Sequence, residues 1–200
     1  AIIGRDGWLF IDESYLLQAN RGAFPFASGE LDDVLGIFLA FQERLKERGI
    51  TYLHVTPPDK QTLYGDYLPD RIHRVGPSRY ARWRSAALMS PLNFVDVYPA
   101  LVAAEAAGEA PYLQTDSHWN CRGAFAAYER IMHFLRERWQ GPLRVLASED
   151  ISFERYRQPL GRDLARNIIG LAYLFPESRA MRCRIEGEAD LAYQTLATGE

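Results

Sequence analysis

The 200-residue sequence is poor in several features that mark common classes of protein. No stretch reaches the roughly 18 consecutive apolar residues of a membrane-spanning helix. The formal net charge is −3, which does not indicate the basic surface of a nucleic-acid binder. Of the 23 basic residues, only Lys46 and Lys60 are lysines and the rest are arginines. The arginine side chain is suited to carboxylate recognition. We therefore expect neither a membrane span nor a nucleic-acid partner in these residues.

Cysteine is also scarce, and its spacing does not suit a metal site. Cys121 and Cys183 lack the closely spaced pairs that zinc sites use. Two interpretations stay open: a disulfide formed in an oxidising compartment, or two unpaired small apolar side chains. A disulfide would close a loop of about 60 residues, worth roughly 4 kcal/mol in the chain-entropy description.

The remaining composition fits one folded domain. At 48% hydrophobic residues, a chain of this length buries a sizeable core without added cross-links. Helical spacing of apolar residues predicts helices over 30–48, 78–89, 99–108 and 121–139, with weaker signals over 162–174. Runs of β-branched and aromatic residues predict strands over 50–56, 92–97 and 181–185. Helices alternating with strands indicate the α/β class.

The tetrad Asp116-Ser117-His118-Trp119 carries the clearest chemical signal. A carboxylate two residues before an imidazole can fix the tautomer of the ring and leave its far nitrogen free to take a proton. The alternative is that Asp116 or Ser117 caps the following helix and that His118 is a surface residue. Asn120 is predicted to cap that helix, to order the loop, or to do both.

Three other histidines are weaker candidates for a general base. His133 lies on a polar helix face and His73 in a polar loop, while His54 is predicted to be a satisfied core residue. None of the three has a carboxylate two residues before it. His118 is therefore the predicted base.

The loop 57–69 follows the end of a predicted strand, where ligands bind in open α/β sheets. Lys60 and Tyr64 in this loop are predicted to bind substrate, together with Trp119 and Asn120. The alternative is a Pro-rich structural loop, with Trp119 as a packing anchor.

A nucleophilic serine in a Gly-Asp-Ser turn is missing from residues 1–200. Gly65-Asp66 is followed by Tyr67, and Gly76-Pro77-Ser78 is typical of a helix cap. We therefore expect 1–200 to be a single domain that stops before its nucleophile segment, and expect this fragment alone to be inactive.

An ordered set of short motifs resembles the SGNH-hydrolase-like alginate O-acetyltransferases of the AlgJ/AlgX type. The motifs span roughly residues 4–170 and are Gly7-Trp8-Leu9-Phe10, Pro58-Asp59-Lys60, Tyr67-Leu68-Pro69, Thr115 to Asn120, Gly123-Ala124 and Asp163-Leu164-Ala165. The inserted Arg162 between Gly161 and Asp163 departs from the family's Gly-Asp-Leu.

The resemblance implies a three-layer α/β sandwich with a mainly parallel sheet, incomplete at its C-terminus. It implies Asp116 and His118 as catalytic carboxylate and base and a serine downstream. No metal or other cofactor is expected. It also implies a periplasmic O-acetyltransferase acting on a polysaccharide, with a membrane-bound acyltransferase as acetyl donor. A deacetylating esterase and a non-catalytic carbohydrate-binding or assembly module are the alternatives.

Overall fold

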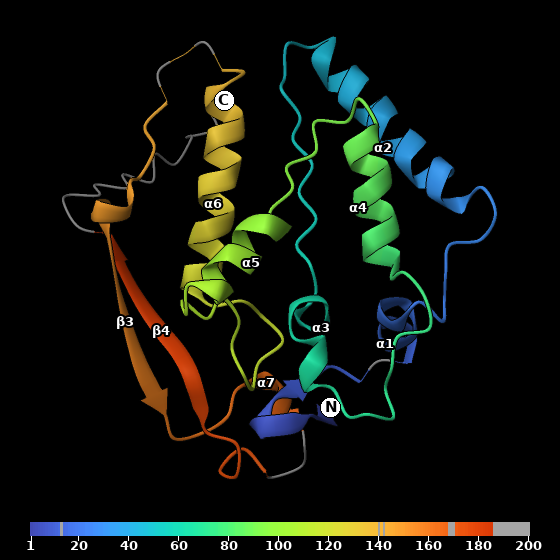
Figure 1. Ribbon diagram of the computed structural model, residues 1–200. Helices are drawn as coiled ribbons and strands as arrows, with labels where there is room; N and C mark the ends of the chain where they lie inside the picture. The colour runs from blue at the N-terminus through green and yellow to red at the C-terminus, as the bar shows by residue number, and fades with distance from the viewer. Residues whose placement is uncertain (13, 140, 142, 168–170, 186–200) are drawn as a thin grey trace, which may run out of the picture.

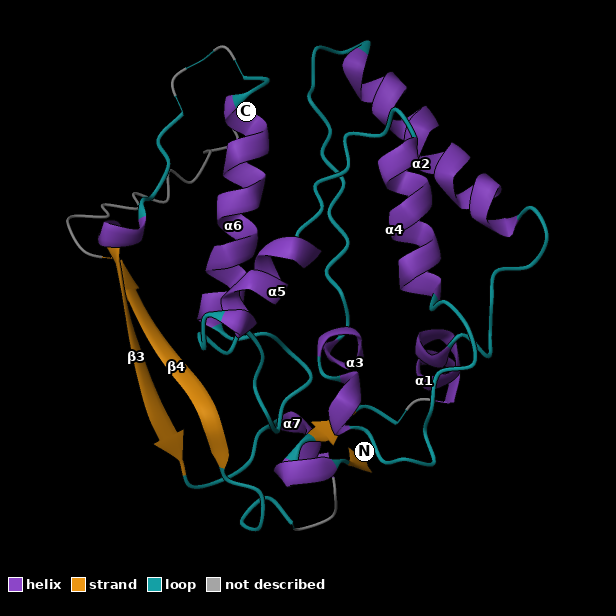
Figure 2. Ribbon diagram, in the orientation of Figure 1, coloured by secondary structure: helices purple, strands orange, loops and turns teal. Residues whose placement is uncertain are grey.

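The computed structural model describes residues 1–12, 14–139, 141, 143–167 and 171–185. Helices dominate these residues, and the few strands are short or lie near the end of the described chain (Figure 2). The elements in chain order are β1 Ile2–Ile3, η1 Arg5–Gly7, β2 Leu9–Phe10, α1 Ser14–Arg21, α2 Glu30–Lys46, α3 Lys60–Leu63, η2 Gly65–Tyr67, α4 Arg79–Met89, α5 Tyr98–Ala106, α6 Cys121–Arg136, η3 Ser148–Asp150, β3 Ile151–Gln158, α7 Asp163–Asn167 and β4 Glu177–Ile185.

Two groups of helices flank a central pair of extended segments (Figure 1). On one side α2 packs against α4 around Trp83, Phe94 and Phe38. On the other side α5 packs against α6, and the main core of buried residues lies there, between Trp8 of the N-terminal turn and Leu101 of α5. The N-terminal hairpin β1–β2 and the short α3 and α7 lie together at one end of the molecule (Figure 1).

The predicted strands 50–56 and 92–97 lie side by side but form only one isolated bridge. His54 pairs with Phe94 in the parallel direction, through His54 N–H to the Asn93 carbonyl and Val95 N–H to the His54 carbonyl, both at 2.9 Å. Pro57-Pro58 follows one segment and Pro91 precedes the other, so donors are missing where pairing would extend. The expectation of regular strands at these positions is wrong for the described residues, and a mainly parallel, three-layer sheet stays a prediction.

The named strands of the described chain pair antiparallel. β3 was not predicted; it pairs with β4, which contains the predicted strand 181–185 and begins earlier, at Glu177. Phe153 of this ribbon contacts Phe125 of α6, with ring centroids 5.6 Å apart, and the guanidinium of Arg122 lies 4.2 Å from the Phe153 ring centroid. One face of the ribbon is thereby held against α6.

The four predicted helices between residues 30 and 139 form, with ends shifted by a few residues. Gly49 takes the positive φ of 70° just beyond α2, a conformation that glycine adopts readily where a helix ends. Ser78 caps α4 by accepting from the Ala81 N–H at 3.0 Å. The predicted helix 162–174 is reduced to α7, while 168–170 lie outside the described residues.

The two cysteines form a disulfide. Cys121 is the first residue of α6 and Cys183 lies in β4, with Cα atoms 6.3 Å apart. Of the two interpretations left open by the sequence, the structure confirms the disulfide. It ties the helix that follows the tetrad to the strand that completes the ribbon.

Because the bridge closes a loop with a sequence separation of 62, replacing both cysteines with serine is expected to lower the free energy of unfolding by about 4 kcal/mol. Urea denaturation of the oxidised protein and of Cys121→Ser/Cys183→Ser measures the difference. Thiol titration of the unfolded, unreduced wild type provides the control and should find none of the two thiols reactive. Two reactive thiols would contradict the bridge.

Candidate active site

The tetrad lies in a tight turn between α5 and α6. Tyr112 and Trp119 form an antiparallel bridge, and the Leu113 N–H donates to the His118 carbonyl at 3.3 Å. The Asn120 N–H donates to the Pro111 carbonyl at 2.9 Å. Residues 114–117 are therefore the tip of a hairpin-like loop whose two arms are joined just before α6.

Asn120 fixes the start of α6, as predicted from its type and position. Its side-chain oxygen accepts from the N–H groups of Arg122 at 2.9 Å and Gly123 at 3.2 Å. A Cβ at position 123 would lie 2.4 Å from the Pro111 carbonyl oxygen, so glycine is required for this close approach. The helix is thus packed directly onto the arm of the loop.

Asp116 and His118 form the predicted pair. The carboxylate Oδ1 of Asp116 lies 2.7 Å from His118 Nδ1 and also accepts the His118 N–H at 3.0 Å. Asp116 is buried, whereas the side chain of His118 is 75% exposed. In the part of the chain that the structure describes, Nε2 of His118 has no hydrogen-bond partner. The ring is therefore held at one nitrogen and open at the other.

The electrostatics favour an ionised Asp116. Burial raises the pKa of Asp116, but the hydrogen bonds from the backbone and ring of His118, with the charge of Arg162, outweigh burial and hold this pKa below its usual value. The Arg162 Nε lies 3.5 Å from Asp116 Oδ2. An ionised carboxylate only accepts hydrogen bonds, so the neutral ring carries its proton on Nδ1 and presents a bare Nε2.

A second carboxylate, Asp163 at the start of α7, supports the same turn. It accepts the Ser117 N–H at 2.8 Å and the Ser117 hydroxyl at 2.5 Å, and its Oδ2 lies 3.8 Å from His118 Nδ1. Residue-by-residue reasoning from the sequence did not single out Asp163. The signal that was present was its place in the Asp163-Leu164-Ala165 motif.

Asp116, His118 and Asp163 also make up a group in which one ligand atom of each lies within 4.8 Å of the others. Such a group has the residue types of a metal site. Here the Nδ1 of His118 and both oxygens of Asp163 already take part in hydrogen bonds within the turn. The arrangement is therefore better suited to moving a proton at Nε2 than to ligating an ion at Nδ1.

Three of the four residues predicted to bind substrate lie inside the molecule. Lys60 is 2% exposed and its Nζ donates to backbone carbonyls; Tyr64 is 2% exposed, and its hydroxyl donates to Glu105. Asn120 is buried as the helix cap. The fourth, Trp119, is half-buried, with its ring centroid 6.5 Å from that of Tyr112. The side chains of Lys60, Tyr64 and Asn120 are buried and do not face an open surface. Their polar atoms are bonded to the protein interior and are not available to a substrate.

The most buried acid of the site, Glu177 in β4, was missed. Its side chain is fully buried and accepts from the N–H groups of Gln114 at 3.0 Å and Thr115 at 2.7 Å. No local pattern near residue 177 could indicate this role, because the partners are more than 60 residues away.

The competing histidines take the roles predicted for them. The ring nitrogens of His54 lie 3.0 Å from the Tyr52 hydroxyl and 2.9 Å from the Thr56 hydroxyl, and burial lowers its pKa. His133 is exposed on α6, 3.3 Å from Glu137. His73 is exposed as well. His118 alone of the four joins an exposed ring to a buried carboxylate.

Residues 1–172 match the family model described as "SGNH hydrolase-like domain, acetyltransferase AlgX". The chain belongs to this family. The chain is 32% identical over 146 residues to the probable alginate O-acetylase AlgJ of Pseudomonas aeruginosa, covering 68% of this chain and 33% of that protein. It is 27% identical over 135 residues to the AlgJ protein of Pseudomonas fluorescens, covering 65% and 32%. The chain spans about a third of the length of these curated relatives.

Two solved structures to which this chain is similar show the same fold. The O-acetyltransferase domain of Pseudomonas putida AlgJ matches with a TM-score of 0.59 at 21% identity, over 92% of this chain and 65% of that one. Bacillus cereus PatB1 matches with a TM-score of 0.57 at 16% identity, over 92% and 58%. The SGNH-hydrolase-like fold of this family member follows from these matches and from the family model.

The burial of Lys60 leads to a prediction about pH. Burial lowers the pKa of Lys60 to about 7 from its ordinary 10.5, although the charges of Glu177, Asp163 and Asp116 raise it. Between these two values the unfolded chain binds more protons than the folded chain, so stability rises with pH. Relative to Lys60→Met, the wild type should gain roughly 2 kcal/mol in free energy of unfolding between pH 7.5 and 9.5.

Urea denaturation at both pH values measures this gain. Lys46→Met is the matched control, because Lys46 is exposed and the variant should show the same rise as the wild type. Identical pH dependences of the wild type and Lys60→Met would contradict the prediction.

Proposed function

We propose that this chain is part of an O-acetyltransferase that acts on a secreted or cell-surface polysaccharide. The observation that supports it is the ionised, buried Asp116 bonded to Nδ1 of an exposed His118 ring. Membership of a family described as acetyltransferases, and similarity to proteins named alginate O-acetylases, favour acetyl transfer over other uses of such a pair. Alginate is the polymer that those names suggest.

In the proposed mechanism His118 is a general base twice. Its Nε2 first takes the proton of a serine hydroxyl while the serine oxygen attacks the acetyl carbonyl of the donor, and the protonated ring then gives that proton to the departing group. A sugar hydroxyl next loses its proton to Nε2 while its oxygen attacks the carbonyl of the acetyl-serine. The protonated ring then gives that proton to the serine oxygen as the bond between this oxygen and the acetyl carbon breaks. Asp116 stabilises the imidazolium that forms in both steps.

The serine is assigned by the family resemblance alone, which puts it in a Gly-Asp-Ser-like turn further along the chain. A membrane-bound acyltransferase is the proposed acetyl donor. In this proposal residues 1–200 supply the base His118 and its carboxylate Asp116.

The proposed compartment is the periplasm. The Cys121–Cys183 disulfide supports it, because structural disulfides persist in oxidising compartments. Among the described residues, no helix combines the length and the apolar character needed to cross a bilayer.

Loss of the base tests the proposal. In the full-length protein, His118→Ala and Asp116→Asn should each lower the rate of acetyl transfer to an oligosaccharide, Asp116→Asn by about 10⁴-fold as in the serine-protease precedent. His133→Ala is the matched control, because His133 is an exposed histidine paired with Glu137, and it should keep the wild-type rate.

Transfer to the oligosaccharide and release of free acetate are measured together. Release without transfer would replace the transferase by an esterase, in which water takes the place of the sugar hydroxyl. A wild-type rate in Asp116→Asn would reduce Asp116 to a structural residue, and a full-length protein without either activity would favour a binding or assembly module.

A further inference from the structure

A buried ammonium meets the carbonyl side of the turn that carries the tetrad. The Nζ of Lys60, the first residue of α3, lies 3.3 Å from the carbonyl oxygen of Leu113, 3.1 Å from that of Gln114 and 2.6 Å from that of Asp116. These bonds use all three donors that an ammonium has. Lys60 also lies over aromatic rings, with Nζ 5.6 Å from the Trp8 ring centroid, so no solvent-facing direction is left.

A buried carboxylate meets the amide side of the same turn. Glu177, the first residue of β4, accepts the N–H groups of Gln114, Thr115 and Arg179 and the Thr115 hydroxyl, at 2.7 to 3.0 Å. Its side chain is fully buried, and each of its oxygens receives two donors. A charge-assisted hydrogen bond is stronger than one between neutral groups, so this contact holds the turn firmly.

Lys60 and Glu177 bond the same two peptide units, 113–114 and 114–115, one at the carbonyl side and the other at the amide side. Lys60 orients the carbonyls of residues 113, 114 and 116, while Glu177 orients the amides of residues 114 and 115. The shortest bond of Lys60 goes to the backbone carbonyl of Asp116, the same residue whose carboxylate holds the His118 ring. The direction in which Asp116 presents Oδ1 therefore depends on peptide planes that this pair fixes.

We propose that Lys60 and Glu177 are positioning residues for the Asp116–His118 pair. The inference rests on the proposed function insofar as His118 is the base, but the alignment of the ring can be observed without turnover. Neither side chain touches His118, and both act through the backbone of residues 113–116. Since displacements of about 1 Å in a catalytic group can cost about 10²-fold in rate, small changes in these planes are expected to matter.

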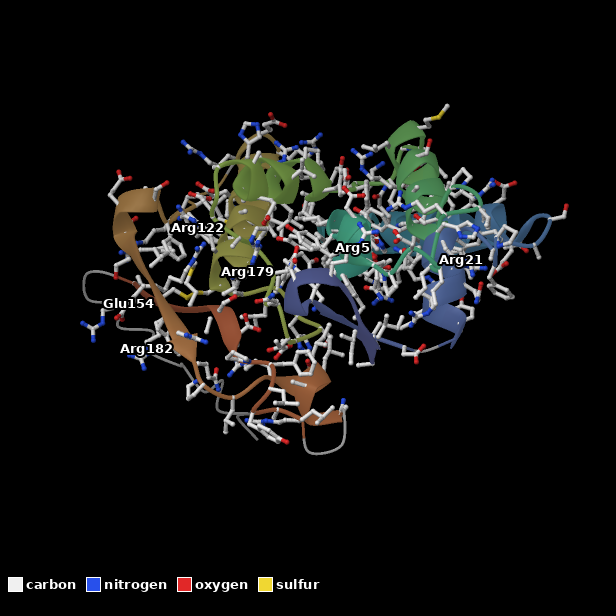
Figure 3. The ribbon with its side chains drawn as sticks, turned by 60° about the horizontal axis from the view of Figure 1, so that its bottom comes forward. Arg5, Arg21, Arg122, Glu154, Arg179 and Arg182 are labelled. Atoms are coloured by element: carbon white, nitrogen blue, oxygen red, sulfur yellow. A yellow bond between two sulfur atoms is a disulfide. The ribbon has the colours of Figure 1, made fainter. Side chains whose placement is uncertain are left out.

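The neighbours of Glu177 show that it is part of a connected interior. Arg179, two residues later in β4, donates to Glu105 at 3.0 Å and lies 4.6 Å from the Trp8 ring centroid. In Figure 3 Arg179 points toward the centre of the molecule, whereas Glu154 and Arg182 lie at the outer edge of the ribbon. The β3–β4 ribbon therefore offers matched variants: Glu177 in β4, which bonds the turn, and Glu154 in β3, which lies at the outer edge.

The experiment reads the His118 ring directly. Nitrogen-15 NMR of the neutral ring in the 200-residue chain should show a proton on Nδ1 in the wild type. Lys60→Met and Glu177→Gln should weaken this signal and populate the tautomer with the proton on Nε2, while Lys46→Met and Glu154→Gln should leave the wild-type spectrum unchanged. In the full-length protein the first two variants should lower kcat about 10²-fold with little change in KM.

Each outcome decides the inference. A folded Lys60→Met and a folded Glu177→Gln with the wild-type ring signal and rate would overturn it. Loss of the folded state in both, judged by near-UV circular dichroism, would assign the pair to stability and overturn the positioning role as well. If the ring signal changes as expected but the wild-type full-length protein transfers no acetyl group, the positioning role stands and the proposed function fails.

Discussion

A short turn held between the buried amine of Lys60 and the buried carboxylate of Glu177 is the constraint on which the rest of this site depends. The ammonium of Lys60 and the carboxylate of Glu177 are taken out of water, and each compensates its loss of hydration with several backbone hydrogen bonds. Each side chain bonds the backbone of the turn and not the other side chain, so the two hold the turn independently. The exposed His118 thus owes its orientation to groups that no solvent reaches.

The loop has a buried, rigid inner side and a solvent-accessible outer side. Asp116, Thr115 and Asn120 are buried and fully bonded, and they form the inner side of the loop. His118 forms the outer side and keeps one ring nitrogen free. Reactive groups on loops work well when a rigid scaffold positions them, and here the scaffold comes from the starts of α3, α6, α7 and β4.

Contacts between residues close in sequence could be predicted, and contacts between residues far apart in sequence could not. The Asp116–His118 bond, the Asn120 cap and the satisfied His54 follow from short spacings, so residue types alone indicate them. The resemblance to AlgJ and AlgX proteins found the family. Lys60 was predicted to bind substrate, but its side chain is buried against the turn. The sequence could not show this, because a lone lysine in a loop normally faces water. Glu177 and β3 gave no local signal, and the predicted strands 50–56 and 92–97 reduce to a single bridge because pairing depends on neighbours that a periodicity does not show.

The distance along the chain between Thr115 and its buried acid has a consequence for biosynthesis. Glu177 lies 62 residues after Thr115, so a ribosome that has released α6 has still not delivered the acid that the turn requires. Before Glu177 is available the amides of Gln114 and Thr115 lack their buried acceptor, and contacts this far apart in sequence are slow to form. We therefore expect the turn to reach its final geometry only after β4 has been synthesised.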